Sequence, residues 1–271
     1  MPSLPITKIL LPVDFSARAE EALRYAVPMA RHFNAELVLL HVLEPIHADF
    51  AMVELPDAFA SLSQTQRERA RVQLEHFVSS DFAGVKVDRR IAEGQPADEI
   101  LRQAEGMGLV IMPTQGHGRI REFLIGSVTA KVLHDCSRPV LTGVHLGENA
   151  QFPDWRVDRI LCAIDFGPEC QSVLRWGKRL ADEFRSEVTV VHAGSDPNLV
   201  QQVNDCVRAS SLKASVLVMP GEPHDVVADT ARQERADLLI IGRGSSVGAL
   251  GRLRAQAYQI VRKSPCPVLS V

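Results

Sequence analysis

The sequence contains an internal repeat, and this repeat constrains the fold more than any other feature. The segment KILLPVDFS begins at Lys8, RILCAIDFG begins at Arg159, and each is an apolar run closed by Asp-Phe. Three more pairs recur in the same order: ELVLLHV and EVTVVHA, EGQPADEI and PGEPHDVV, SRPVLTG and PCPVLSV. We therefore expect two copies of one domain, at 1–146 and 156–271, joined by a polar linker from Gly147.

Within each copy, short apolar runs alternate with amphipathic segments. After Asp14 the apolar residues have helical spacing, and Ser16 is suited to be the N-cap of that helix. The runs without alternation favour parallel strands covered on both faces, so each copy is expected to form an α/β unit with a doubly wound, parallel, five-stranded sheet. In the first copy these strands are expected at 6–13, 36–42, 85–91, 108–113 and 138–144.

The two copies differ after their second strand. The first copy carries an extra stretch there, which leads into a helix predicted near 63–80. The second copy is shorter at this place, so we expect a tighter connection.

Composition excludes several classes of function. Hydrophobic residues make up 46% and charged residues 23% of the 271 residues, which is typical of a soluble globular protein. A net charge of -3 argues against nucleic acid or anionic membranes as partners. The apolar runs are too short to span a bilayer and no secretion signal is recognised, so a cytoplasmic location is expected. The five scattered cysteines predict reduced structural thiols, and no histidine spacing suggests a metal site.

Two features far apart in the sequence are expected to meet in one crevice. Asp14 follows the first strand and a glycine-rich loop follows the fourth, and ligands of such sheets bind beyond the carboxyl ends of the strands. In the loop, glycines allow backbone N–H groups to approach an anion, and the start of the next helix offers free amides and hydroxyl donors. The loop and helix residues concerned are Gly116, Gly118, Gly126, Ser127 and Thr129.

A purely structural interpretation of these residues stays open. Ser127 could only cap a helix, and Asp14 could only cap the helix that starts near Ser16. His41 and His192, at the ends of the second strands, are expected to be structural rather than catalytic. No Gly-Lys-Ser/Thr motif and no catalytic triad spacing is present.

The segment PTQGHGRIREFLIGSVTAKVLHDCSRPVL, together with the apolar strand that ends at Asp14, resembles the universal stress protein family. ATP-binding members of that family carry G-x2-G-x9-G-[S/T] in this unit. Gly116 and the pair Gly126-Ser127 match the pattern, whereas Pro113 stands at its first glycine. The resemblance covers nearly the whole chain as two tandem copies. It implies a flavodoxin-like, Rossmann-like fold of the adenine nucleotide alpha hydrolase type.

The resemblance also implies a set of contacts with ATP. Asp14 and the backbone of Val42 would contact adenine, and Pro12 and Val13 would line its pocket. Ribose and phosphates would be held by Gly116, Gly126, Ser127, Val128 and Thr129. Pro113 has no N–H, which removes one backbone contact but leaves the helix end.

The second copy departs further from the family pattern. Gly244 takes the place of Gly116, but Arg254-Ala255 replaces the Gly-Ser pair. We hypothesise that the second site is lost or altered and that Arg254 fills its phosphate pocket.

Three functions follow as hypotheses. The first is a universal stress protein that binds ATP, with or without Mg²⁺, in its N-terminal half and acts as a sensor or regulator with at most slow hydrolysis. The second is a nucleotide-free interaction module, in which the terminal strands PVLTG and PVLSV pair within the chain and a homodimer is a further option. The third is an enzyme such as a nucleotidyl transferase, which the absence of a catalytic constellation disfavours.

Overall fold

The computed structural model describes residues 6–45, 56–77, 82–113, 125–143, 156–243 and 251–271 of the chain. The strands in this part are β1 (Lys8–Pro12), β2 (Glu36–Leu43), β3 (Val87–Glu93), β4 (Leu109–Pro113), β5 (Val140–Gly143), β6 (Arg159–Ala163), β7 (Glu187–Ala193), β8 (Ser215–Met219), β9 (Leu238–Ile241) and β10 (Val268–Ser270). The helices are α1 (Ala17–His32), α2 (Pro56–His76), α3 (Pro96–Ala104), α4 (Ser127–Asp135), α5 (Cys170–Phe184), α6 (Leu199–Ala209), α7 (Pro223–Gln233) and α8 (Gly251–Lys263).

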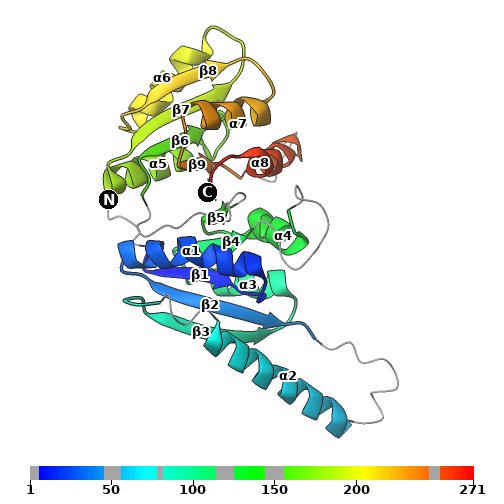
Figure 1. The fold of residues 1–271 in the computed structure, drawn as a ribbon. Helices are drawn as coiled ribbons and strands as arrows, with labels where there is room; N and C mark the ends of the chain where they lie inside the picture. Colours follow the sequence, from blue (N-terminus) through cyan, green and yellow to red (C-terminus); the bar gives the residue numbers. More distant parts are fainter. Residues whose placement is uncertain (1–5, 46–55, 78–81, 114–124, 144–155, 244–250) are drawn as a thin grey trace.

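The strands of the described residues form one ten-stranded sheet in the order β3-β2-β1-β4-β5-β10-β9-β6-β7-β8. All pairs within each half are parallel, and each half has its first strand at the centre, as a doubly wound sheet requires. The only antiparallel pair in this sheet, β5 with β10, joins the two halves. The two predicted five-stranded sheets are therefore present and continuous with each other (Figure 1).

The join between the halves is self-complementary. Leu141 of β5 pairs with Leu269 of β10, which is its own counterpart in the repeat. A second pair of counterparts, Phe33 after α1 and Phe184 of α5, meets edge to face with ring centroids 5.9 Å apart. The halves are thus related by a pseudo-two-fold axis, as two subunits with an isologous interface would be. The sequence hypothesis that the terminal strands meet within one chain is confirmed.

Local structure follows the sequence patterns closely. All five strands expected in the first copy are present, and the Ser16 hydroxyl accepts a hydrogen bond from the Ala19 amide at 3.2 Å, so Ser16 caps α1. The helix predicted near 63–80 instead spans Pro56–His76; Pro56 is suited to a first helical position and marks this start in the sequence. The connection between β7 and α6 is shorter than that between β2 and α2, as expected.

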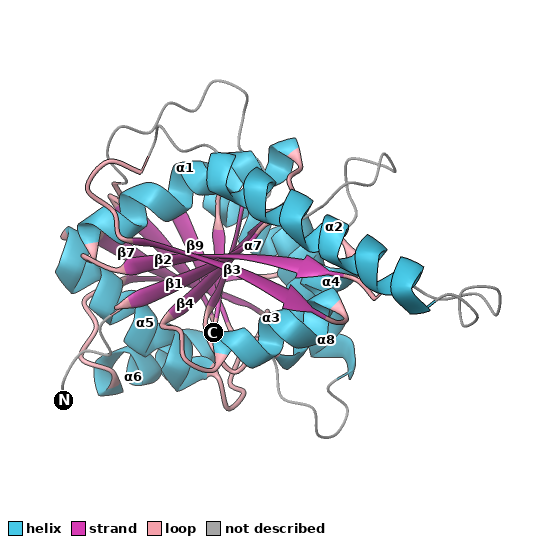
Figure 2. Cartoon of the chain, turned by 90° about the horizontal axis from the view of Figure 1, so that it is seen from below, coloured by secondary structure: helices cyan, strands magenta, loops and turns pink. Residues whose placement is uncertain are grey.

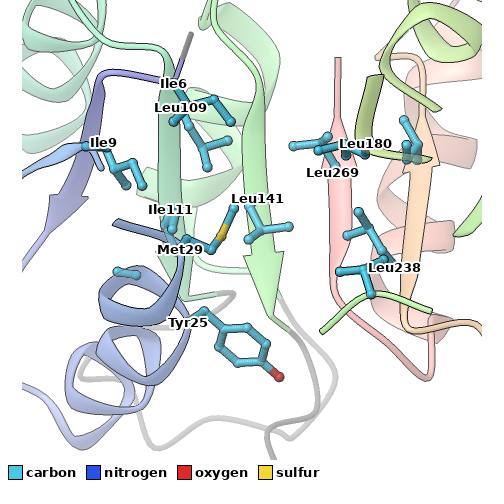
Figure 3. Close-up of a cluster of buried hydrophobic side chains, with 14 of the residues drawn as sticks. Ile6, Ile9, Tyr25, Met29, Leu109, Ile111, Leu141, Leu180, Leu238 and Leu269 are labelled. Carbon is cyan, nitrogen blue, oxygen red and sulfur yellow. The ribbon is translucent and has the colours of Figure 1, made fainter. Parts of the chain in front are cut away.

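The sheet is buried on both faces. Helices α1, α2, α5 and α6 cover one face, where Leu141 and Leu269 help to make one continuous cluster across both halves (Figure 3). Seen from below, the strands lie between helices on both sides (Figure 2). Helices α3 and α4 cover the other face of the N-terminal half, and α7 and α8 cover that of the C-terminal half. Burial on both faces explains why the strand sequences are continuously apolar. No helix in the described ranges has the length and apolar character needed to span a bilayer.

The cysteines predict a simple pattern of thiol reactivity. All five are free, and only Cys206 is half-buried rather than buried. Burial raises the pKa of Cys162 and of Cys170 to about 12, and that of Cys266 to about 11. Because a raised pKa keeps a thiol protonated at pH 8, we expect one fast-reacting thiol per native chain with Ellman's reagent, and five after denaturation. Cys206→Ser should remove the fast phase; a second fast thiol in the native protein would contradict this account.

Candidate nucleotide site and a second cavity

Asp14 forms the bend that turns β1 into α1. Its Oδ1 accepts hydrogen bonds from the Ser16 amide at 3.0 Å and from the Ser16 hydroxyl at 2.6 Å. Phe15, between them, has a φ of 59°. Asp14 thus has a structural role, but it holds the Ser16 cap and does not cap α1 itself. The residue is nevertheless exposed at the carboxyl edge of the sheet, where a ligand can reach it.

One histidine in each half stabilises the carboxyl edge of the sheet by the same contacts. The Nδ1 of His41 donates to the Val13 carbonyl at 2.7 Å, and its ring lies against Phe15 with centroids 4.4 Å apart. His192 repeats this arrangement with the Ile164 carbonyl at 2.8 Å and with the Phe166 ring at 4.7 Å. Because a carbonyl only accepts, Nδ1 carries the proton in both rings. The prediction that these histidines are structural agrees with these contacts.

The helix expected to bind phosphate begins without a side-chain cap. Gly126 is the N-cap residue of α4, with φ -62° and ψ 150°, and within the described part of the chain no side-chain cap bond reaches the first turn. The first turn also carries no acidic residue. The first amides of a helix have no intrahelical acceptor, so the first turn of α4 presents N–H donors and partial positive charge. By contrast, the Ser16 hydroxyl caps α1.

Thr129 differs from its predicted role. Its side chain is buried, and its hydroxyl donates to the carbonyl of Pro113 at 3.0 Å. This bond connects the first turn of α4 to the end of β4. The hydroxyl proton of Thr129 is therefore used within the protein and is not offered to a ligand. Ser127, in contrast, is exposed. Of the two hydroxyls expected to face phosphate, only that of Ser127 is accessible in this structure.

The remaining predicted residues lie at the same edge of the sheet, except for those outside the described residues. Strands β1 and β4 are neighbours, with Ile9 beside Leu109, so the carboxyl ends of both strands reach the switch point of strand order together. Pro12 and Val42 are half-buried there and Val13 is buried. Val128, in the first turn of α4, packs against the core of this half. Gly116, Gly118 and Gly244 lie outside the described residues, and so does the side chain of Arg254.

The C-terminal half contains a cavity that the sequence reasoning missed. It has a volume of about 130 Å³ and lies at the carboxyl ends of β6, β7 and β9, beneath α7 and α8. Three small residues that line it, Ala163, Ala193 and Ala257, stand where the first copy has Pro12, Val42 and Thr129. These replacements were a signal in the sequence that could have revealed the cavity.

The helix above this cavity begins earlier than its counterpart. Buried Ile260 and Val261 of α8 match buried Val132 and Leu133 of α4. With this match, Ala255 corresponds to Ser127, yet α8 already begins at Gly251. The free amides of α8 are thus about one helical turn away from the place that α4 offers to an anion. The prediction that the second site is altered is consistent with this difference.

Comparisons with known proteins agree with the fold and its duplication. The model of the universal stress protein family matches residues 5–142, 156–205 and 196–271. Universal stress protein MJ0577 of Methanocaldococcus jannaschii is 30% identical over 159 residues, which cover 51% of this chain and 95% of the relative. YxiE of Bacillus subtilis is 29% identical over 142 residues, covering 49% and 96%. The crystal structure of a universal stress protein from Archaeoglobus fulgidus is similar over 98% of both chains, with a TM-score of 0.76 and 22% identity.

Proposed function

This chain belongs to the universal stress protein family, and from that premise we propose that its N-terminal half binds ATP and that the protein acts as a sensor or regulator. The observation that supports the proposal most is the uncapped start of α4, which presents amide donors at the sheet edge that also carries Asp14. A carboxylate there can accept a hydrogen bond from the exocyclic amine of adenine. Pro12 and Val42, both half-buried at this edge, supply apolar surface for the base.

Magnesium would arrive with the nucleotide. Among the described residues there is no group of three or more His, Cys, Asp or Glu side chains that could hold a metal ion. Mg²⁺ is commonly bound through substrate phosphates, one or two carboxylates and water, so the phosphates can supply most of its ligands. We therefore propose ATP with Mg²⁺ as the ligand, and no dedicated magnesium cage.

A direct test begins with the protein as purified. Denaturation followed by chromatography should release adenine nucleotide if the site was occupied, and titration of the emptied protein should give one ATP site per chain. Thermal unfolding should shift upward with ATP more than with AMP or FMN. cAMP, which a solved universal stress protein carries in its crystal structure, is a useful fourth ligand. Absence of binding with all four would support the second function, an interaction module without nucleotide.

That second function has its own support in the described structure. The strand edges that would pair two subunits, β5 and β10, already pair within the chain. Pro113 also removes one N–H from the loop side of the crevice. A homodimer of this chain would need surfaces other than the β5 and β10 edges.

The contrast between Ser127 and Thr129 gives a matched pair of variants. Thr129→Val should leave ATP affinity unchanged within about twofold and lower the free energy of unfolding by about 1 kcal/mol, because its hydroxyl serves only the Pro113 carbonyl. Ser127→Ala should weaken ATP severalfold without changing stability, because Ser127 is exposed. Calorimetric titration and denaturant unfolding measure the two effects, and the reverse assignment would contradict the site.

A further inference from the structure

The cavity of the C-terminal half has the size of an aromatic ring. At about 130 Å³ it approaches the roughly 150 Å³ at which an engineered apolar cavity in another protein admits benzene. Its walls are mostly aliphatic and come from the ends of three strands and from the helices α5, α7 and α8. Such a site favours a flat apolar ring, and the polar groups at its rim determine which substituents on that ring are tolerated.

The rim of the cavity is acidic. Asp165 and Glu169 both line it and both are half-buried. A Cβ added at Gly242 would lie 2.7 Å from the Cβ of Glu169, so this glycine is needed for Glu169 to sit against the end of β9. At the position of Glu169 the first copy has Arg18. The two halves therefore carry opposite charges at equivalent places beside their crevices.

Two cationic residues of the described C-terminal half donate to partners outside the cavity lining. Arg243 interacts electrostatically with Glu169, but its guanidinium donates a hydrogen bond to the carbonyl of Cys136 in the other half. Burial lowers the pKa of Arg243. Lys263 pairs with Asp225 on α7.

Two further polar residues that line the cavity, His192 and Gln256, also have partners within the protein. His224 bonds through Nδ1 to the Gln256 side chain at 2.8 Å, and His192 uses Nδ1 for the Ile164 carbonyl. Among the described residues that line the cavity, Asp165 and Glu169 are the two carboxylates that a ligand meets.

We propose that this cavity binds a flat aromatic ring that carries an amino or amidinium group and no phosphate. The ring fills the aliphatic chamber, and the amino or amidinium group donates to Asp165 and Glu169 at the rim. A phosphate is disfavoured because two carboxylates lie close by and because the amide donors of α8 begin about one turn away. The proposal concerns the C-terminal half and does not depend on ATP binding in the N-terminal half.

Ligands of one shape and different charge test the proposal on the full chain. Benzamidine, benzamide and benzoate share a ring but carry a positive, zero and negative charge at pH 7.5. Ligand-observed NMR and calorimetric titration should show benzamidine binding at least tenfold more tightly than benzoate, with benzamide between them. Adenosine should likewise bind this cavity more tightly than AMP when the N-terminal site is disabled by Gly126→Asp.

Variants identify the site of binding. Glu169→Gln should weaken benzamidine about tenfold and leave benzamide nearly unchanged, whereas Arg18→Gln, the matched change in the first copy, should have no effect. Ala257→Trp should block the chamber for all three ligands, and Ala257→Leu gives a milder filling if the larger side chain impairs folding. The proposal would be overturned if benzoate bound as tightly as benzamidine. It would also be overturned if AMP bound more tightly than adenosine and lost this advantage in Arg254→Ala. A failure of ATP titration alone would overturn only the function proposed for the other half.

Discussion

Gly126→Asp should abolish ATP binding while leaving the folded chain as stable as before or slightly more stable. Aspartate is a favoured N-cap residue, and Gly126 has backbone angles that any residue can adopt. The new carboxylate would accept hydrogen bonds from the first turn of α4, occupying the amides that phosphate needs, and would repel phosphate by charge. We expect at least a hundredfold loss of affinity, or about 2.7 kcal/mol, measured by calorimetric titration.

Two further substitutions at this position separate the causes. Gly126→Asn also caps the helix but adds no charge, so it should lose affinity to a smaller degree than Gly126→Asp. Gly126→Ala neither caps the helix nor adds charge, so its ATP affinity should stay within severalfold of that of the unmodified chain. If Gly126→Asp bound ATP as the unmodified chain does, the start of α4 would not be the phosphate site.

Leu269→Ala should produce the largest loss of stability among the changes considered. Leu269 is 3% exposed in the cluster that spans both halves, and it pairs with Leu141 at the only antiparallel join of the described sheet. Removing such a side chain typically costs about 2–5 kcal/mol of unfolding free energy. Denaturant unfolding followed through the fluorescence of Trp176 in α5, in a Trp155→Phe background that leaves it as the one tryptophan of the sequence, and through far-ultraviolet circular dichroism should show the loss in one shared transition.

Controls for this prediction come from the same sheet and from the surface. Leu141→Ala should cost a similar amount, because Leu141 is the counterpart of Leu269 across the pseudo-two-fold axis. Leu62→Ala on α2, where the side chain is 47% exposed, should change stability by no more than about 0.5 kcal/mol. A loss that appeared only in the signal of the C-terminal half would show that the two halves unfold separately.

Much of the fold could be predicted because its signals are local or repeated. Continuous apolar runs marked the strands, the spacing after Asp14 marked α1, and Ser16 is the cap that was expected. The prediction placed the start of α2 too late, although Pro56 at the first helical position is a start signal in the sequence.

The candidate site was predicted in position but not in every role. Strand order alone brings Asp14 and the end of β4 to one edge. Whether a hydroxyl faces solvent or its own backbone depends on packing, and Thr129 donates to Pro113 for that reason. Sequence spacing carries no information on such a bond, since the two residues belong to different elements.

The duplication, the parallel order of each half and the edge where Asp14 meets the end of β4 follow from the sequence, because hydrophobic period and repeat order are properties of the chain. Two features follow from packing alone: one ten-stranded sheet forms through Leu141 and Leu269, and the C-terminal half keeps an open chamber. A chamber depends on the summed volumes of side chains from several separate elements. Small residues such as Ala163 and Ala257 leave space only once those elements have packed together.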